Sequence, residues 1–309
     1  MNQRIRSGIL LACALALPAC GGAGGGDGNA TGRLNLRIGD APVDGASEVV
    51  VVFTGIELHG NGRTVSFDFP APRQVDLLAY QNGATFNLVE SLEVDAGEYQ
   101  WMRLKVIAER NRSDGSYILF VSGEQYPLFV PSGAETGLKI NRPFRIAAGG
   151  ITRLVADFDL RKSVIAPPGL SPNYLLKPVL RLLDALEIGT IQGEVDLGAL
   201  AAEQLGAGAT AADCAGGIYL FAGADATPDD ADGDPADGAD PVVYAPLQLE
   251  GTATTASFRF ALVEAGDYTV AATCDFDVDQ SPEESEYDPG AASGQPGFET
   301  MRWTVQAGV

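Results

Sequence analysis

The sequence contains a single histidine, His59, and only four cysteines. A Ser-His-Asp triad would have to use that histidine, and no Gly-x-Ser-x-Gly turn accompanies it. Transition-metal sites need clusters of histidine or cysteine, which the chain lacks. These absences argue against a serine hydrolase and against zinc or copper chemistry. We expect His59 to face solvent at the end of a strand.

Basic residues are almost missing from residues 188–309, which contain Arg259 and Arg302 against 22 acidic residues. Residues 33–187 contain 16 basic and 18 acidic residues, so the net charge of -21 lies mainly in the C-terminal part. Such a surface repels phosphate backbones. The charge distribution therefore argues against nucleic acid as a partner.

No hydrophobic run is long enough to span a bilayer; the one at residues 9–17 is too short. It follows Arg4 and Arg6 and precedes Leu-Pro-Ala-Cys, ending at Cys20, which is the order of a bacterial lipoprotein signal. The pattern predicts a signal peptide over residues 1–19, a lipidated (palmitate-bearing) Cys20, and a glycine-rich tether over residues 20–32. Cleavage after Ala16, as in an ordinary secretory signal, is the alternative. Because no aspartate follows Cys20, we expect attachment to the outer membrane of a Gram-negative cell.

Of the four cysteines, Cys13 lies in the predicted signal peptide and Cys20 is the predicted lipidation site. After export, Cys214 and Cys274 therefore remain in an oxidising compartment. We expect them to form a disulfide bond, with a pair of buried thiols as the alternative. Closing the intervening loop would stabilise the fold by about 4 kcal/mol in the chain-entropy account.

Strand signals run along the whole body of the chain as short β-branched and aromatic segments separated by Gly, Pro, Asn and Asp. They predict an all-β protein with two antiparallel β-sandwich domains, immunoglobulin-like or transthyretin-like, over residues 33–187 and 188–309. Only residues 197–205 read as a helix, with a turn near residues 77–80. The clearest strand segments are 48–53, 63–69, 99–108, 117–121, 126–130 and 152–160.

A short pattern occurs twice, as Val-Asp-Ala-Gly-Glu-Tyr at residues 94–99 and Val-Glu-Ala-Gly-Asp-Tyr at residues 263–268. Glycine supplies the turn, and the tyrosine enters the next strand as a buried anchor with its hydroxyl at the rim. The arrangement resembles transthyretin-like and carboxypeptidase-regulatory-like modules. That resemblance implies a second sandwich beginning near Ile191.

Five phrases in the N-terminal half resemble one family, the domain of unknown function 4382 of bacterial lipoproteins. They lie at residues 36–44, 75–83, 130–139, 157–164 and 174–181. The resemblance implies a lipid-anchored envelope protein with an antiparallel β domain, often followed by a regulatory-like sandwich. It implies no catalytic residues.

The phrases at residues 157–164 and 174–181 contain a cluster of charged residues. Its members are Asp157, Asp159, Arg161, Lys162, Lys177 and Arg181. The cluster is interpreted as an ion-pair network where strand ends meet, or as a site in which Arg161, Lys162, Lys177 and Arg181 bind an anionic glycan or a partner carboxylate.

Calcium is the one cofactor with candidate ligands, in an acidic segment directly after Cys274. These ligands are Asp275, Asp277, Asp279, Glu283 and Glu286. Their spacing is that of an EF-hand loop, but Gln280 stands where the sharp turn needs glycine. A second aspartate-rich run covers residues 229–240. The alternative interpretation is a solvated acidic loop.

These observations predict a non-enzymatic binding or assembly module held at the membrane by lipid, with an envelope protein or glycan as its partner. Paired carboxylates of a glycosidase stay open, because their separation depends on the fold. Two alternatives remain: an accessory protein of a polysaccharide-processing enzyme, and a structural spacer.

Overall fold

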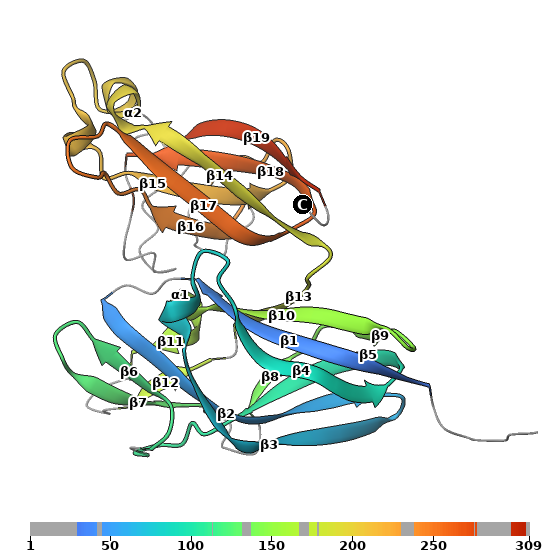
Figure 1. The fold of residues 1–309 in the computed structure, drawn as a ribbon. Coiled ribbons are helices and arrows are strands. Elements are labelled where there is room, and N and C mark those ends of the chain that lie inside the picture. The colour runs from blue at the N-terminus through green and yellow to red at the C-terminus, as the bar shows by residue number, and fades with distance from the viewer. Residues whose placement is uncertain are drawn as a thin grey trace, which may run out of the picture.

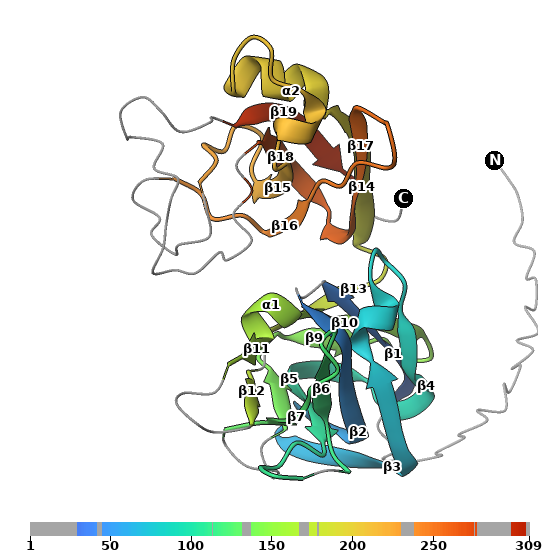
Figure 2. The same cartoon turned by 90° about the vertical axis from the view of Figure 1, so that its left-hand side faces the viewer.

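The computed structural model describes residues 30–41, 45–112, 114–131, 137–166, 173–177, 179–229, 238–274, 276 and 298–306. Figures 1 and 2 show two stacked β regions, with the C-terminal one lying over one sheet of the N-terminal one. The all-β prediction is confirmed. Within the described residues, no helix has the length and apolar character needed to cross a membrane.

The N-terminal region has a four-stranded sheet and a larger sheet of nine strands. The first contains, in spatial order, β13 (Leu180–Asp184), β10 (Ile151–Asp159), β1 (Thr31–Ala41) and β4 (Phe86–Asp95). The second has the order β11 (Val164–Ile165), β12 (Tyr174–Leu176), β7 (Gln125–Phe129), β6 (Tyr117–Phe120), β2 (Ala46–Gly60), β5 (Gly97–Val106) and β8 (Leu138–Ile140). In addition, β3 (Arg63–Asp76) pairs with β2, and β9 (Phe144–Ile146) pairs with β5.

Two strand pairs in this region are parallel, although the sequence predicts antiparallel sheets. β1 runs parallel to β10, with Arg33 opposite Ile151, and β12 runs parallel to β7. The other pairs are antiparallel. Two short helical turns, η1 (Leu77–Tyr80) and α1 (Leu160–Ser163), follow β3 and β10 directly.

The C-terminal region has a two-stranded and a four-stranded sheet. The first pairs β14 (Ile188–Asp196) with β17 (Thr255–Glu264), and the second has the order β16 (Val243–Pro246), β15 (Gly217–Ala222), β18 (Gly266–Thr273) and β19 (Glu299–Val305). Helix α2 (Leu197–Gln204) and the turn η2 (Ala211–Asp213) lie at one end. Asp196 caps α2 by accepting hydrogen bonds from the Gly198 and Ala199 amides.

Each region has its own hydrophobic core. The N-terminal core contains inward side chains of both sheets, including Leu36, Phe53 and Phe158, all at most 1% exposed. Two clusters fill the C-terminal region, one around Leu220 and Phe260, the other around aromatic residues such as Tyr219. Among the described residues, no core cluster combines side chains of both regions.

The repeated tyrosine pattern has the same structure in both copies. The Tyr99 hydroxyl donates to the Asp95 carbonyl over 2.9 Å, and the Tyr268 hydroxyl donates to the Glu264 carbonyl over 2.9 Å. Both tyrosines are buried. The predicted buried anchor is thus confirmed, with each hydroxyl bonded to a carbonyl that precedes the turn, and burial raises the pKa of both phenols.

A candidate binding site between the two regions

A cavity of about 210 Å³ lies where the two regions meet. One wall comes from β10, α1 and β13, and the opposite wall comes from the segment that enters β16. Figure 2 shows α1 at the end of the N-terminal region that faces the C-terminal region. The charged lining residues are Asp157, Asp159, Lys162 and Arg181; Val179, Leu180, Val242, Val243 and Tyr244 are among the others.

The burial pattern of β10 shows how the C-terminal region creates this site. Strand β10 sends Leu154, Ala156 and Phe158 into the N-terminal core, so Val155 and Asp157 point to the other face of the sheet. Both are nevertheless buried, at 2% and 6% exposure. An exposed sheet face would leave them in water, so this burial reflects coverage by the second region.

Asp157 forms an ion pair with its cross-strand neighbour Arg181. The Arg181 Nη2 and Nε atoms lie 2.5 Å and 3.2 Å from the same carboxylate oxygen, Oδ2. Burial raises the pKa of Asp157, and the charge of Arg181 only partly opposes this effect. Desolvation dominates because the Asp157 side chain is 8% exposed, whereas Arg181, at 38%, is screened by water.

Lys162 and Asp159 form the second charged pair. Asp159 caps α1 by accepting a hydrogen bond from the Lys162 amide, and its carboxylate lies 3.6 Å from Lys162 Nζ. That distance exceeds a normal hydrogen bond, so the ammonium keeps its donors for another acceptor. In both pairs the cation is more exposed than its carboxylate. The two cations are thus more open to solvent than the carboxylates, and all four residues line the cavity.

The structure brings together only part of the cation set predicted from sequence. Lys162 and Arg181 line the cavity. Lys177 is exposed and does not line the cavity. Its backbone amide donates a hydrogen bond to the Ser163 carbonyl, at the end of α1. Arg161 lies in α1, but its side chain is outside the described residues. Residues 242–244 carry no sequence signal for a role in this site, because strand β16 belongs to the other region.

Contacts between described residues also join the two regions. Arg142 Nη2 lies 2.5 Å from a carboxylate oxygen of Glu264, and Arg259 Nε donates to the Asn82 carbonyl over 3.2 Å. Leu262 packs over Gly39 of β1, where an added Cβ would lie 2.7 Å from its Cδ1. Leu262 has a left-handed φ of 57° at a bulge in the pairing of β17 with β14. The residue with this uncommon backbone conformation is thus also the one that contacts Gly39 of the other region.

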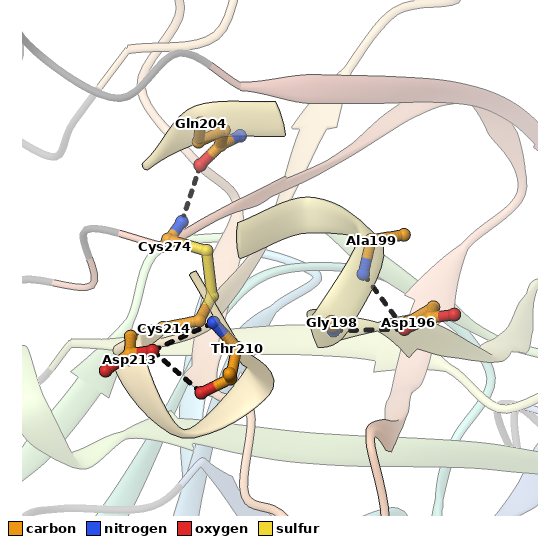
Figure 3. The surroundings of a disulfide bond; sticks show 8 residues. All are labelled: Asp196, Gly198, Ala199, Gln204, Thr210, Asp213, Cys214 and Cys274. Carbon is orange, nitrogen blue, oxygen red and sulfur yellow. Dashed lines mark hydrogen bonds between the residues drawn. A yellow bond between two sulfur atoms is a disulfide. The ribbon is translucent and has the colours of Figure 1, made fainter. Parts of the chain in front are cut away.

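The predicted Cys214–Cys274 disulfide is present, with its Cα atoms 4.6 Å apart (Figure 3). Cys274 also donates its amide hydrogen to Gln204 Oε1, at the end of α2, over 2.8 Å. Beside it, the Thr210 amide and hydroxyl donate to Asp213, which lowers the pKa of that carboxyl. The disulfide bond therefore holds the helical end of the C-terminal region to the end of β18.

The predicted calcium ligands Asp275, Asp277, Asp279, Glu283 and Glu286 all lie outside the described residues. Of the second acidic run, Asp229 is buried and Asp240 is exposed, whereas residues 230–237 are also outside the description. Among described residues, no group of three or more His, Cys, Asp or Glu side chains is placed to hold a metal ion. Cys20 likewise lies outside the described residues, so lipidation stays a prediction.

His59 lies near the end of β2, as the sequence predicts, but it is half-buried. Its ring stacks on Trp101 with centroids 5.0 Å apart and planes 3° apart, and its Nδ1 lies 2.8 Å from the Thr64 hydroxyl oxygen. Arg103 and Lys139 also lie over the indole, within 5.0 Å of its centroid. His59 therefore packs against Trp101 and contacts Thr64, which is a structural role.

Fold and site together define an all-β protein in which two β regions share a charged cavity. The family model described as Domain of unknown function (DUF4382) matches residues 31–178. This match confirms the resemblance of the N-terminal region to that family. It includes Asp157 and Lys162 but ends before Arg181.

No curated protein matches the chain. A solved leucine-rich repeat protein from Bacteroides thetaiotaomicron is similar at 12% identity and a TM-score of 0.20, over 90% of this chain and 25% of that one. A DUF3823 family protein from Bacteroides ovatus is similar at 8% identity and a TM-score of 0.16, over 87% and 97% of the two chains. The present chain thus spans about a quarter of the leucine-rich repeat protein. TM-scores this low support no argument about fold or function.

Proposed function

We propose that this protein is a non-enzymatic, lipid-anchored module of the cell envelope that binds a carboxylate group of an envelope glycan or protein. The observation that carries the proposal is the pair of cations, Lys162 and Arg181, in the cavity between the regions. We also propose that the two regions are separate domains, since each has its own core.

The chemistry of the cavity favours a small acidic group. Arg181 uses Nε and Nη2 for Asp157, and Lys162 Nζ lies beyond hydrogen-bond distance of Asp159. Guanidinium and ammonium donors held in this way suit a carboxylate. The cavity, at about 210 Å³, is smaller than the ~300–1,000 Å³ typical of pockets for drug-sized ligands. A single acidic sugar residue or a peptide C-terminus matches that size.

The test is calorimetric titration of the protein with oligogalacturonate and with a short peptide bearing a free C-terminal carboxylate. Matched neutral probes are the methyl-esterified oligosaccharide and the amidated peptide. We expect binding of an acidic probe, no binding of its neutral partner, and weakening by about 10- to 100-fold in Lys162→Gln, because a charge-assisted hydrogen bond contributes about 1.5–3 kcal/mol.

Lys177→Gln is the matched control, since it removes the same charge from an exposed lysine outside the cavity lining. Equal weakening by both substitutions would show that the cavity is not the site. Binding to neither acidic probe would remove the proposal and leave the structural-spacer interpretation. Which acidic probe binds decides between a glycan and a protein partner.

A further inference from the structure

Two strands of the C-terminal region have an edge without a strand partner among the described residues. β14 pairs only with β17, and β19 pairs only with β18. The two strands nevertheless lie beside one another. An unpaired strand edge presents a row of backbone donors and acceptors that can pair with another extended chain.

A cavity of about 470 Å³ is lined by residues of both strands. We call it the β14–β19 slot. Its lining consists of Gly193, Glu194, Val195 and Asp196 of β14, Thr300, Met301 and Trp303 of β19, and Ile218, Phe258, Val270 and Ala272. Side chains alternate between faces along a strand, so one face alone would contribute only every second residue. Four successive residues of β14 show that its main-chain edge borders the slot.

The floor of the slot is apolar and continuous with the C-terminal core. Ile218 and Val270 are buried members of that core, at 1% and 5% exposure. Met301, on the rim, is 62% exposed, which is unusual for a large hydrophobic side chain. The slot therefore combines backbone hydrogen-bonding edges with an apolar floor, as binding by strand addition requires.

The negative charge of the C-terminal region indicates which kind of extended peptide the slot favours. Glu194 is exposed within the lining, and the C-terminal region contains 22 acidic residues against two basic ones. A segment with lysine or arginine next to its apolar positions is attracted to this surface, whereas an acidic segment is repelled.

We infer that the β14–β19 slot binds an extended peptide segment that adds as a strand along β14. Its alternate apolar side chains contact the floor, and its intervening basic side chains face the acidic surface. This site is distinct from the cavity between the regions and binds a ligand of opposite charge.

The experiment measures the fluorescence anisotropy of a labelled, acetylated octapeptide of alternating valine and lysine, titrated with the whole protein. A peptide of the same sequence with N-methylated backbone amides tests strand pairing, and a valine–glutamate peptide tests charge. We expect the valine–lysine peptide to bind and the other two to fail.

Met301→Lys places a charge in the slot, and Leu205→Lys is its matched control. Leu205 is also an exposed hydrophobic residue of the C-terminal region, at 45% exposure, but it lies outside the slot. Both substitutions change the net charge of the protein by the same amount, so a difference between them reports on the slot itself. We expect Met301→Lys to weaken binding about tenfold more than Leu205→Lys does, because only the first loses apolar contact.

Circular dichroism melting checks that each variant folds, and Met301→Ser, with Leu205→Ser as its control, replaces the lysine pair if Met301→Lys unfolds. Three results would overturn the inference: no anisotropy change up to millimolar protein, equal weakening by the paired substitutions at Met301 and Leu205, or equal binding of the N-methylated peptide. The first excludes a peptide site, the second indicates unspecific charge attraction, and the third excludes strand addition.

Discussion

Replacing Arg181 by methionine is expected to expose the cost of burying Asp157. The substitution keeps a long side chain over the sheet but removes the cation that lies 2.5 Å from the carboxylate. Breaking a buried ion pair by removing one partner costs about 3–5 kcal/mol. Arg181 is 38% exposed, so water already screens part of its charge. The expected loss at neutral pH is therefore about 2–3 kcal/mol, or about 4–12 °C in Tm.

The pH dependence identifies Asp157 as the origin of this loss. Burial raises the pKa of Asp157, so the folded protein holds that proton more tightly than the unfolded chain does. Its protonation therefore stabilises the fold as pH falls through the raised pKa, and that stabilisation is lost as pH rises above it. Without Arg181 the pKa rises further, so the cost of Arg181→Met is largest at neutral pH and shrinks in acid.

Urea unfolding followed by circular dichroism at pH 7.5 and pH 5 measures these differences. Asp157→Asn is the control background, because it removes the carboxylate and with it the need for a cation. In that background Arg181→Met should cost less than about 1 kcal/mol at either pH. A loss of the same size at both pH values, or an undiminished loss in the Asp157→Asn background, would refute the reasoning.

Three further predictions concern the C-terminal region and the repeated turn. Tyr99→Phe and Tyr268→Phe should each cost about 1 kcal/mol in urea unfolding, because each removes one equivalent hydrogen bond to a backbone carbonyl; markedly unequal costs would contradict the equivalence of the two turns. Cys214→Ser with Cys274→Ser should lower the free energy of unfolding by about 4 kcal/mol, and a loss below about 1 kcal/mol would show that the chain-entropy account fails here. The calcium interpretation predicts a Tm increase in millimolar calcium that Asp277→Asn abolishes, and an unchanged Tm would reject it.

The sequence predicts most features that depend on local chemistry. Strand segments and the short α2 follow from side-chain periodicity and turn residues, and the tyrosine turn repeats because the same six-residue pattern repeats. The disulfide is predicted because only two cysteines of the exported chain, Cys214 and Cys274, have no other assigned role. Each of these rests on residues that are close in sequence or few in number.

The features that sequence reasoning missed depend on contacts between distant segments. Nothing near β10 indicates that Asp157 is covered by a second region, and alternating charge reads equally well as a solvated surface. Leu262 has no signal for a left-handed conformation, which non-glycine residues rarely adopt. The sequence predicts a cation cluster that contains Lys162 and Arg181, but it also assigns Lys177 to that cluster, because sequence proximity does not show which way a strand end faces.

The parallel pairing of β1 with β10 affects how the chain folds. β1, the first described strand, lies between β10 and β4, so one of its two neighbours follows only after most of the N-terminal region. When β1 through β9 have been synthesised, two of the four strands of this sheet, β10 and β13, are therefore still missing. Non-local pairing of this kind slows folding, because loop closure precedes the gain from the contact. The N-terminal region is thus expected to stay unfolded during synthesis until Ile151–Asp159 emerges, which lengthens the interval in which chaperones can bind the chain.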